Sequence, residues 1–340
     1  MSPRIAILVA AAVLAWLVGV PLAVGDRPYD IGVLTTASAL SVISAGVWLM
    51  FYIGRIHIGQ GAFALVGQYA AAVAITKLGL SFWIALPLAG LVAALFACAI
   101  GFPILRLKGV YFAMVTLSLT EAARLSAQSF ESVTGGPRGI LNIPLPGAVE
   151  VFGLTLVPDF GEVNPHIALF CLATLLAVAT FAALYRIVNS RLGWLFRSLQ
   201  QNEDLASSIG VNVARLRVVA FAIGSFLGGI GGAFFLAVQQ SVYPSSFQVQ
   251  DSIYLMLYCF LGGLGYVFGP LVGTFVLFIA FEFLHGLNEF QPLIYALIMI
   301  GLMVWLPNGL LSLRLPGSGP GDGGGRPPWR RWLRRPENRT

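Results

Sequence analysis

Charged residues are scarce in this 340-residue chain. Asp, Glu, Lys and Arg together make up 10% of it, whereas a soluble domain carries about 25%. The hydrophobic share is correspondingly high, at 58%, and the mean hydropathy is +0.85. A soluble protein cannot expose so much apolar surface to water, but a protein in a bilayer exposes it to lipid. The composition therefore argues against a soluble enzyme or a nucleic-acid-binding protein and predicts an all-α integral membrane protein.

Residues that carry chemistry are also few. The chain has three histidines, three cysteines and only the lysines Lys77 and Lys108, and it contains no HExxH or CxxC motif. Neither lysine follows the glycine spacing of a phosphate-binding loop, so the chain is not expected to hydrolyse ATP itself. The cysteines fall in apolar stretches, which indicates small core residues. We therefore expect no catalytic residue, no metal and no cofactor.

Long apolar runs fill most of the sequence. A helix needs roughly 20 apolar residues to cross the hydrocarbon core of a bilayer. Ten segments are predicted to do so, namely residues 5–24, 31–53, 60–79, 82–105, 109–127, 166–188, 218–238, 252–270, 271–287 and 291–307. The sequence thus predicts a polytopic bundle of about ten transmembrane helices. The boundaries between 252 and 287 are soft, because the glycines there indicate either a turn or a broken helix.

The basic residues predict the orientation of the chain, because cytoplasmic loops are enriched in Lys and Arg. Arginines are concentrated between residues 186 and 217 and after Leu313, whereas the loop 128–165 has four acidic residues and one arginine. We therefore predict a cytoplasmic loop at 189–217, an outer loop at 128–165 and both termini in the cytoplasm. Residues 1–310 form the expected transmembrane domain. Residues 311–340 form an expected disordered Gly/Pro/Arg-rich tail, whose arginines can contact anionic lipid headgroups.

Ionisable residues are nearly absent from the predicted spans, whereas an ion-coupled secondary transporter usually keeps some there. Glu121 lies near the outer end of its predicted span and is expected at the interface, so Glu282 is the exception. It either has a functional role or lies near an interface and bonds a neighbouring helix. Two glycine series recur every four residues, a spacing that predicts one close-packing or sliding helix face. They are Gly224, Gly228 and Gly232, and Gly265, Gly269 and Gly273.

The cytoplasmic stretch 190–212 is too polar to span a membrane. Its pattern predicts a short helix from about Asn202 to Ile209, ended by Gly210. A helix held on the cytoplasmic face of a membrane domain is a natural docking element for a soluble partner, although an ordinary loop is the alternative. The candidate residues of this element are Arg197, Asn202, Glu203, Asp204, Ala206 and Gly210.

Six sequence elements, in order, resemble those of the LivM-type permease subunits of bacterial branched-chain amino acid ABC importers. The resemblance covers about residues 30–310. The elements are Ile58-Gly59-Gln60-Gly61-Ala62-Phe63, Lys108-Gly109-Val110-Tyr111-Phe112-Ala113-Met114-Val115-Thr116-Leu117, Thr134-Gly135-Gly136-x2-Gly139, Arg191-x-Gly193-x3-Arg197 with Asn202-Glu203 and Gly210, Pro244-Ser245-Ser246-Phe247, and Gly262-Gly263-Leu264-Gly265-x3-Gly269-Pro270. The stretch Asp204-Leu205-Ala206-x3-Gly210 departs at its first two positions from the Glu-Ala-Ala-x3-Gly loop of ABC permeases.

The resemblance implies a five-part importer in a bacterial inner membrane. This chain would pair with a second, related permease, and two ATP-binding subunits would dock on the helix from Glu203 to Gly210. An external solute-binding protein would deliver the substrate near the outer loop around Thr134–Gly139. The implied substrates are branched-chain amino acids, with urea or short amides as the alternative.

Two other classes of protein, a secondary transporter and a membrane-embedded enzyme, do not fit the residues. A secondary transporter needs ionisable groups in mid-membrane, and a membrane-embedded enzyme needs a cluster of His, Asp, Glu or Ser. The translocation path is predicted to lie along Gly59, Gln60 and Gln68, because the two glutamines bring polar amides into a span.

Overall fold

The computed structural model describes residues 27–151, 154–157, 160, 164–283 and 309–313, together with residues 16, 17, 19, 293, 297, 300 and 301. Apart from these isolated residues, the predicted spans 5–24 and 291–307 lie outside the described residues, as does the tail from residue 314. The described part is helical, as predicted. It also contains one short antiparallel β-hairpin.

The helices follow one another with short connections. The first half contains α2 (Pro28–Tyr52), α3 (Gln60–Thr76), α4 (Phe82–Ile104), α5 (Val110–Ser129), α6 (Glu131–Thr134), η1 (Gly136–Arg138) and the strands β1 (Val149–Val151) and β2 (Leu154–Val157). The second half contains α7 (Pro165–Val188), α8 (Arg191–Gln201), α9 (Glu203–Ser208), α10 (Val213–Gln239), η2 (Pro244–Ser246), α11 (Val249–Gly262), α12 (Gly269–Phe283) and η4 (Leu310–Leu313).

Four of the described helices, α2, α4, α7 and α10, are long and apolar enough to cross a membrane. The helices α3 and α12 are apolar but shorter. This length and composition, repeated along the chain, identify a multi-pass membrane protein.

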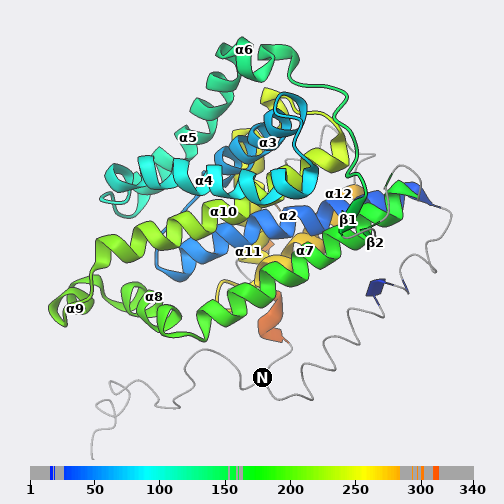
Figure 1. Cartoon of the computed structure of the whole chain (residues 1–340). Coiled ribbons are helices and arrows are strands. Elements are labelled where there is room, and N and C mark those ends of the chain that lie inside the picture. The colour runs from blue at the N-terminus through cyan, green and yellow to red at the C-terminus, as the bar shows by residue number, and fades with distance from the viewer. Residues whose placement is uncertain are drawn as a thin grey trace, which may run out of the picture.

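Helix α10 is the centre of the bundle and packs against α2, α3 and α4 (Figure 1). Small residues make this packing close. A Cβ atom on Gly232 would overlap the backbone carbonyl of Ala64 in α3, and one on Gly224 would crowd the carbonyl of Gly46 in α2. Helices in lipid gain little from the hydrophobic effect between them, so such close van der Waals contact stabilises their association.

Helix α4 presents a matching face to α10. Its buried side includes Ala85, Ala89, Ala93, Ala97 and Gly101, which recur every four residues and therefore lie along one side of the helix. The opposite side exposes large apolar side chains such as Leu91, Leu95 and Phe102. The small residues thus bring α4 onto the core, and the large ones remain free to contact lipid or another subunit.

The second predicted glycine series does not lie on one helix face. Helix α11 ends at Gly262, Gly265 lies in the turn that follows, and α12 begins at Gly269. The predicted span 252–270 is therefore wrong at its end, because Gly263 turns the chain with a φ of 109°. Gly273 still serves close packing, since a Cβ there would overlap the carbonyl of Tyr258 in α11.

The predicted outer loop contains more structure than the sequence indicated. Strands β1 and β2 pair antiparallel, with Glu150 opposite Thr155. Nearer its start, Ile140 bridges to Val242 in the segment after α10. Gly139 has a φ of 67°, and a Cβ at this position would overlap the Val242 carbonyl, which accounts for a glycine there. The outer loop is thereby fixed to the end of α10.

The close contact of α10 with α3 yields a stability prediction. Gly232→Ala is expected to destabilise the protein by about 1–3 kcal/mol, because the added methyl group overpacks the contact with Ala64. Gly32→Ala in α2 is the matched control. Among the described residues nothing lies within 4 Å of its added Cβ, so it should gain about 0.5–1 kcal/mol from helix propensity. Thermal unfolding in detergent measures both, and equal melting temperatures would contradict the account.

Candidate functional site

The segment between α7 and α10 folds into two short helices with local caps. The Ser190 hydroxyl accepts a hydrogen bond from the Leu192 N–H, and the Asn202 side chain accepts from the N–H groups of Asp204 and Leu205 at 3.0 Å. Both are side-chain caps of helix N-termini. Gly210, with a φ of 88°, follows α9. The predicted short helix with its glycine stop is confirmed.

Helices α8 and α9 project from one end of the bundle (Figure 1). Phe196 of α8 and Ala206 of α9 are buried. Three large apolar side chains are nevertheless exposed, Leu205 and Ile209 to 64% and 74%, and Trp194 on α8. They lie beside exposed polar residues of α9, namely Asp204, Ser207 and Ser208. Exposed apolar side chains that gather on one surface are typical of a protein-binding site.

Glu203, the first residue of α9, contacts three basic side chains from other parts of the chain. Its carboxylate lies 2.8 Å from Arg55 Nη2 and 3.4 Å from Lys108 Nζ, and it also pairs with Arg217 Nη2. Arg55 follows α2, Lys108 lies between α4 and α5, and Arg217 lies near the start of α10. We call these four residues the Glu203 cluster.

The cluster is partly shielded from solvent. Arg55 is 3% exposed, whereas Lys108 is 65% exposed. Burial raises the pKa of Glu203, but the charges of Arg55 and Arg217 outweigh it, and the pKa lies below its usual value. Burial lowers the pKa of Arg55, as does the like charge of Arg217, while Glu203 opposes both. Arginine remains protonated in proteins, so Glu203 is the anion that compensates buried positive charge.

The other predicted residues of this segment differ in exposure. Arg197 is half-buried, Asp204 and Gly210 are exposed, and Asn202 caps α9. The segment 186–217, which the charge pattern predicts to be cytoplasmic, meets the basic turn 106–108 here. We therefore use "inner end" for this end of the bundle and "outer end" for the opposite one.

The predicted translocation-path residues lie in the packed interior. Gln60 is fully buried, where its amide nitrogen donates to the Gly224 carbonyl at 2.8 Å and its oxygen lies 3.1 Å from His57 Nε2. A Cβ on Gly59 would overlap the carbonyl of Thr116 in α5. In this structure Gln60 and Gly59 therefore hold helices together.

Gln68 differs from Gln60. It is fully buried on α3, and neither atom of its amide has a hydrogen-bond partner among the residues that the structure describes. An unpaired buried amide costs free energy. Among the three path candidates, Gln68 is therefore the residue whose side-chain amide forms no hydrogen bond within the described bundle.

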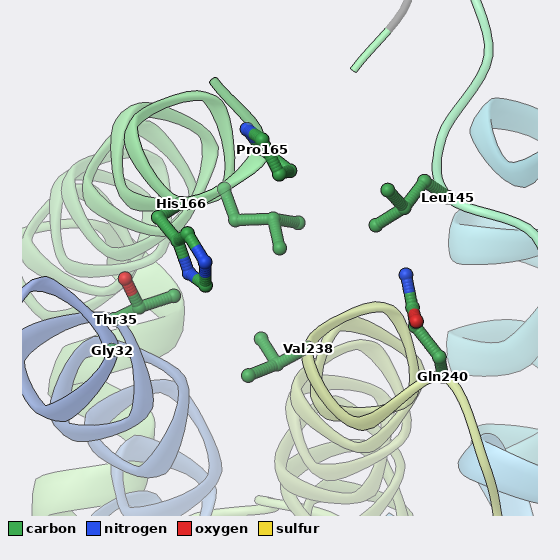
Figure 2. Close-up of a pocket in the computed structure, with 8 residues that line it drawn as sticks. Gly32, Thr35, Leu145, Pro165, His166, Val238 and Gln240 are labelled. Atoms are coloured by element: carbon green, nitrogen blue, oxygen red, sulfur yellow. The ribbon is translucent and has the colours of Figure 1, made fainter. Parts of the chain in front are cut away.

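A cavity of about 260 Å³ lies at the outer end of the bundle. It is lined by Gly32, Thr35, Leu145, Pro165, His166, Leu169, Val238 and Gln240. Figure 2 shows His166 of α7, Val238 of α10 and Gln240 around the same space, with Leu145 of the outer loop facing them. The lining is mainly aliphatic with a few polar groups, as is common in small-molecule sites. None of the predicted path residues borders this cavity.

Glu282 also lies toward the outer end. It is partly buried near the end of α12 and accepts a hydrogen bond from the hydroxyl of Tyr29 at the start of α2. Of the two readings of this residue, the contact favours a bond to a neighbouring helix near the interface. No group of His, Cys, Asp and Glu side chains suited to a metal occurs among the described residues.

Comparison with known proteins decides the family. A model of the family described as the branched-chain amino acid transport system permease component matches residues 30–306. This chain belongs to that family.

The permease is similar to the LivM permease proteins of the high-affinity branched-chain amino acid transport systems of two bacteria. It is 33% identical to that of Escherichia coli over 325 residues, which cover 91% of this chain and 75% of the relative. It is 31% identical to that of Salmonella typhimurium over 318 residues, or 90% and 75% of the two chains.

A more distant relative is the LivH permease protein of Escherichia coli, at 24% identity over 295 residues, which cover 82% of this chain and 93% of LivH. No solved structure matched the chain. The resemblance read from the sequence motifs is confirmed, and the permease is a transport protein rather than an enzyme.

Sequence reasoning missed Arg55 as a functional candidate. Its signal was weak, since Arg55 is the single Lys, Arg, Asp or Glu residue between the predicted spans 31–53 and 60–79. Ser252 was also missed. Its hydroxyl accepts from the Gly61 N–H at 3.1 Å and lies 3.1 Å from the Thr120 hydroxyl, so it joins three helices. Neither contact can be read from spacing along the chain.

Gln68 provides the test of the predicted path. Gln68→Leu is expected to stabilise the permease by about 1 kcal/mol, because it removes an unpaired buried amide. If the amide faces the path in another state, the same change should lower the rate of substrate uptake. Thermal unfolding and uptake are measured on the same preparation, with Gln60→Leu as the comparison that should destabilise. A stabilised Gln68→Leu with unchanged uptake would contradict a role in the path.

Proposed function

We propose that this chain is the membrane-spanning permease subunit of an ATP-driven ABC importer in a bacterial inner membrane. It would form half of the translocation path for branched-chain amino acids. The observation that carries the proposal is the family match over residues 30–306, which includes all the described helices from α3 to α12 and nearly all of α2. The apolar surface on α8 and α9 supports the same function, because an importer subunit needs a place for its energy source to dock.

The second half of the path is proposed to be a related permease. This chain resembles two differently named permease proteins of Escherichia coli, LivM at 33% identity and LivH at 24%. Two related chains of one transport system can pair around a pseudo-twofold axis, since similar folds present similar surfaces. The exposed apolar face of α4, with Leu91 and Leu95, is available for such a contact or for lipid.

Energy is proposed to enter from two ATP-binding subunits on the cytoplasmic side, because the chain has no phosphate-binding loop of its own. Exposed Leu205 and Ile209 give α9 an apolar surface that a groove on such a subunit can cover. An external solute-binding protein would deliver the substrate at the outer loop. The glycines of Thr134–Gly139 hold that loop in tight turns, with positive φ at Gly135, Gly136 and Gly139.

Branched-chain amino acids are the proposed substrate, and the outer cavity supports them over urea or short amides. Its volume of about 260 Å³ suits a small molecule. Leu169, Val238 and Leu145 provide aliphatic surface, while His166 and Gln240 provide polar groups. Such a lining suits an aliphatic side chain attached to a polar head group better than it suits urea, which has no apolar part.

The test is uptake of radiolabelled leucine into proteoliposomes that contain this chain, its candidate partner permease, two ATP-binding subunits and the solute-binding protein. We expect uptake that requires ATP and every component, and that unlabelled isoleucine and valine compete. Uptake by this chain alone under an ion gradient would contradict the proposal. If the complex hydrolyses ATP but takes up no leucine, and urea or amides bind the solute-binding protein, the proposed substrate would be wrong.

Gly210 yields a mutational prediction. Gly210→Arg is expected to reduce ATP-driven uptake at least tenfold without preventing membrane insertion, because a side chain strains a backbone with φ of 88° beside α9. Gly79→Arg is the matched control, since Gly79 is also exposed with a positive φ of 64° but lies at the other end of the bundle. Uptake and membrane abundance are measured together. Normal uptake by an assembled Gly210→Arg complex would contradict the assignment of the coupling helix.

A further inference from the structure

Helix α9 has few attachments to the rest of the permease. It is six residues long, and Ala206 is its only buried residue. The chain on each side is suited to act as a hinge. Asn202 before it is extended, with φ of −162° and ψ of 109°, and Gly210 after it has a φ of 88°. A helix held so loosely would move without displacing the bundle unless side chains connect the two.

The Glu203 cluster supplies that connection. One carboxylate reaches Arg55 at the inner end of α2 and Arg217 at the inner end of α10. The pairs join residues 148 and 14 positions apart in the sequence. A carboxylate with two guanidinium partners makes charge-assisted hydrogen bonds, which are stronger and more directional than neutral ones.

Both arginines also hold the turn between α4 and α5. Arg55 Nη1 donates to the Leu107 carbonyl, and Arg217 Nη1 donates to the Leu105 carbonyl at 3.3 Å. Lys108 of the same turn lies 3.4 Å from Glu203. Through one carboxylate, α9 is therefore linked to the inner ends of α2, α4, α5 and α10. Helix α5 runs from this turn to α6 and η1 in the outer loop.

We propose that Glu203 is a positioning residue that transmits movement of α9 to the transmembrane helices. Arg55 and Arg217 are the partners through which the movement would reach the helices, and the exposed Lys108 adds a weaker ion pair. The inference rests on the proposed function, since it assumes that ATP-binding subunits move α9. Glu203 contacts the transmembrane bundle, whereas the exposed Leu205 and Ile209 would contact the ATP-binding subunit.

The charge balance predicts that a neutral residue cannot replace Glu203. Without its carboxylate, Arg55 and Arg217 would face each other as like charges, one of them 3% and the other 12% exposed. A buried charge that loses its partner is strongly unfavourable, so the arginines would turn away and release α9. The helix itself would remain, because Asn202 caps it independently of Glu203.

The experiment compares Glu203→Gln, Glu203→Asp and wild-type in the complete five-part complex in proteoliposomes. The readouts are leucine uptake, ATP hydrolysis and the ratio between them, all per purified complex. For Glu203→Gln we expect ATP hydrolysis to continue while uptake per ATP hydrolysed falls at least tenfold. Glu203→Asp keeps the charge and should restore part of the ratio. Glu121→Gln is the charge-matched control and should match wild-type. Among the described residues, Glu121 forms an ion pair with its neighbour Arg124 on α5 and with no other side chain.

A double-mutant cycle tests the partner. If Glu203 acts through Arg55, the double variant Arg55→Gln, Glu203→Gln should lose no more uptake per ATP hydrolysed than the worse of the two single variants. Multiplied losses would contradict transmission through this pair. An unchanged ratio in Glu203→Gln, or failure of Glu203→Gln and Glu203→Asp to assemble at all, would overturn the proposal. Wild-type complex that shows no ATP-dependent uptake would instead contradict the proposed function.

Discussion

The fold depends on the close approach of α10 to α2, α3 and α4. In lipid, helices are not driven together by the exclusion of water, so they need intimate contact between their surfaces. Glycines on α10 provide it. Gly224 meets Gly46 of α2, and Gly232 meets the backbone of Ala64 of α3. Gly229 meets both Gly67 of α3 and the backbone carbonyl of Ala89 of α4. Each neighbour of α10 is thus held by backbone contact, which leaves little freedom for one helix to slide past another.

Polar contacts add direction to this packing. Gln60 forms hydrogen bonds with both His57 and the Gly224 carbonyl. These bonds fix the position of the start of α3 along the axis of α10. Ser252 similarly joins α11 to Thr120 of α5 and to the backbone of Gly61. Buried polar groups that are hydrogen-bonded from one helix to another in this way rigidify a core. The central helices therefore form a stiff unit that can move as one body.

The two ends of α10 carry the features of functional interest. Near its inner end Arg217 joins the Glu203 cluster, and at its outer end Val238 and Gln240 line the cavity. In an alternating-access transporter, rigid bodies rock about a site rather than deform. A stiff α10 that connects α9 to the outer cavity would couple events on the two sides of the membrane.

Local signals were readable in the sequence. Asn202 and Gly210 predicted the limits of α9 to within one residue, since a cap and a left-handed stop act over a few residues. Long-range partners were not readable. Nothing in spacing joins Glu203 to Arg55, which lies 148 residues away.

Periodicity also misled where a turn intervened. Gly265 keeps the four-residue spacing of Gly269 and Gly273 but lies outside the helix that holds them. Gly263, with its positive φ, ends α11 where the backbones of Gly262 and Gly269 lie in close contact. The total of ten spans stays a prediction, because the described helices include four of spanning length.

If Glu203 transmits movement of α9 to Arg217, helices α9 and α10 should move as one body. The most direct measurement is the distance between spin labels at Ser207 in α9 and Gln239 at the far end of α10, both exposed, in the assembled complex with Cys98, Cys171 and Cys259 replaced. The account predicts the same distance distribution with and without ATP, while Ser207 shifts relative to the partner permease. A nucleotide-dependent change of about one helical turn, roughly 5 Å, between Ser207 and Gln239 in a complex that still transports would contradict it.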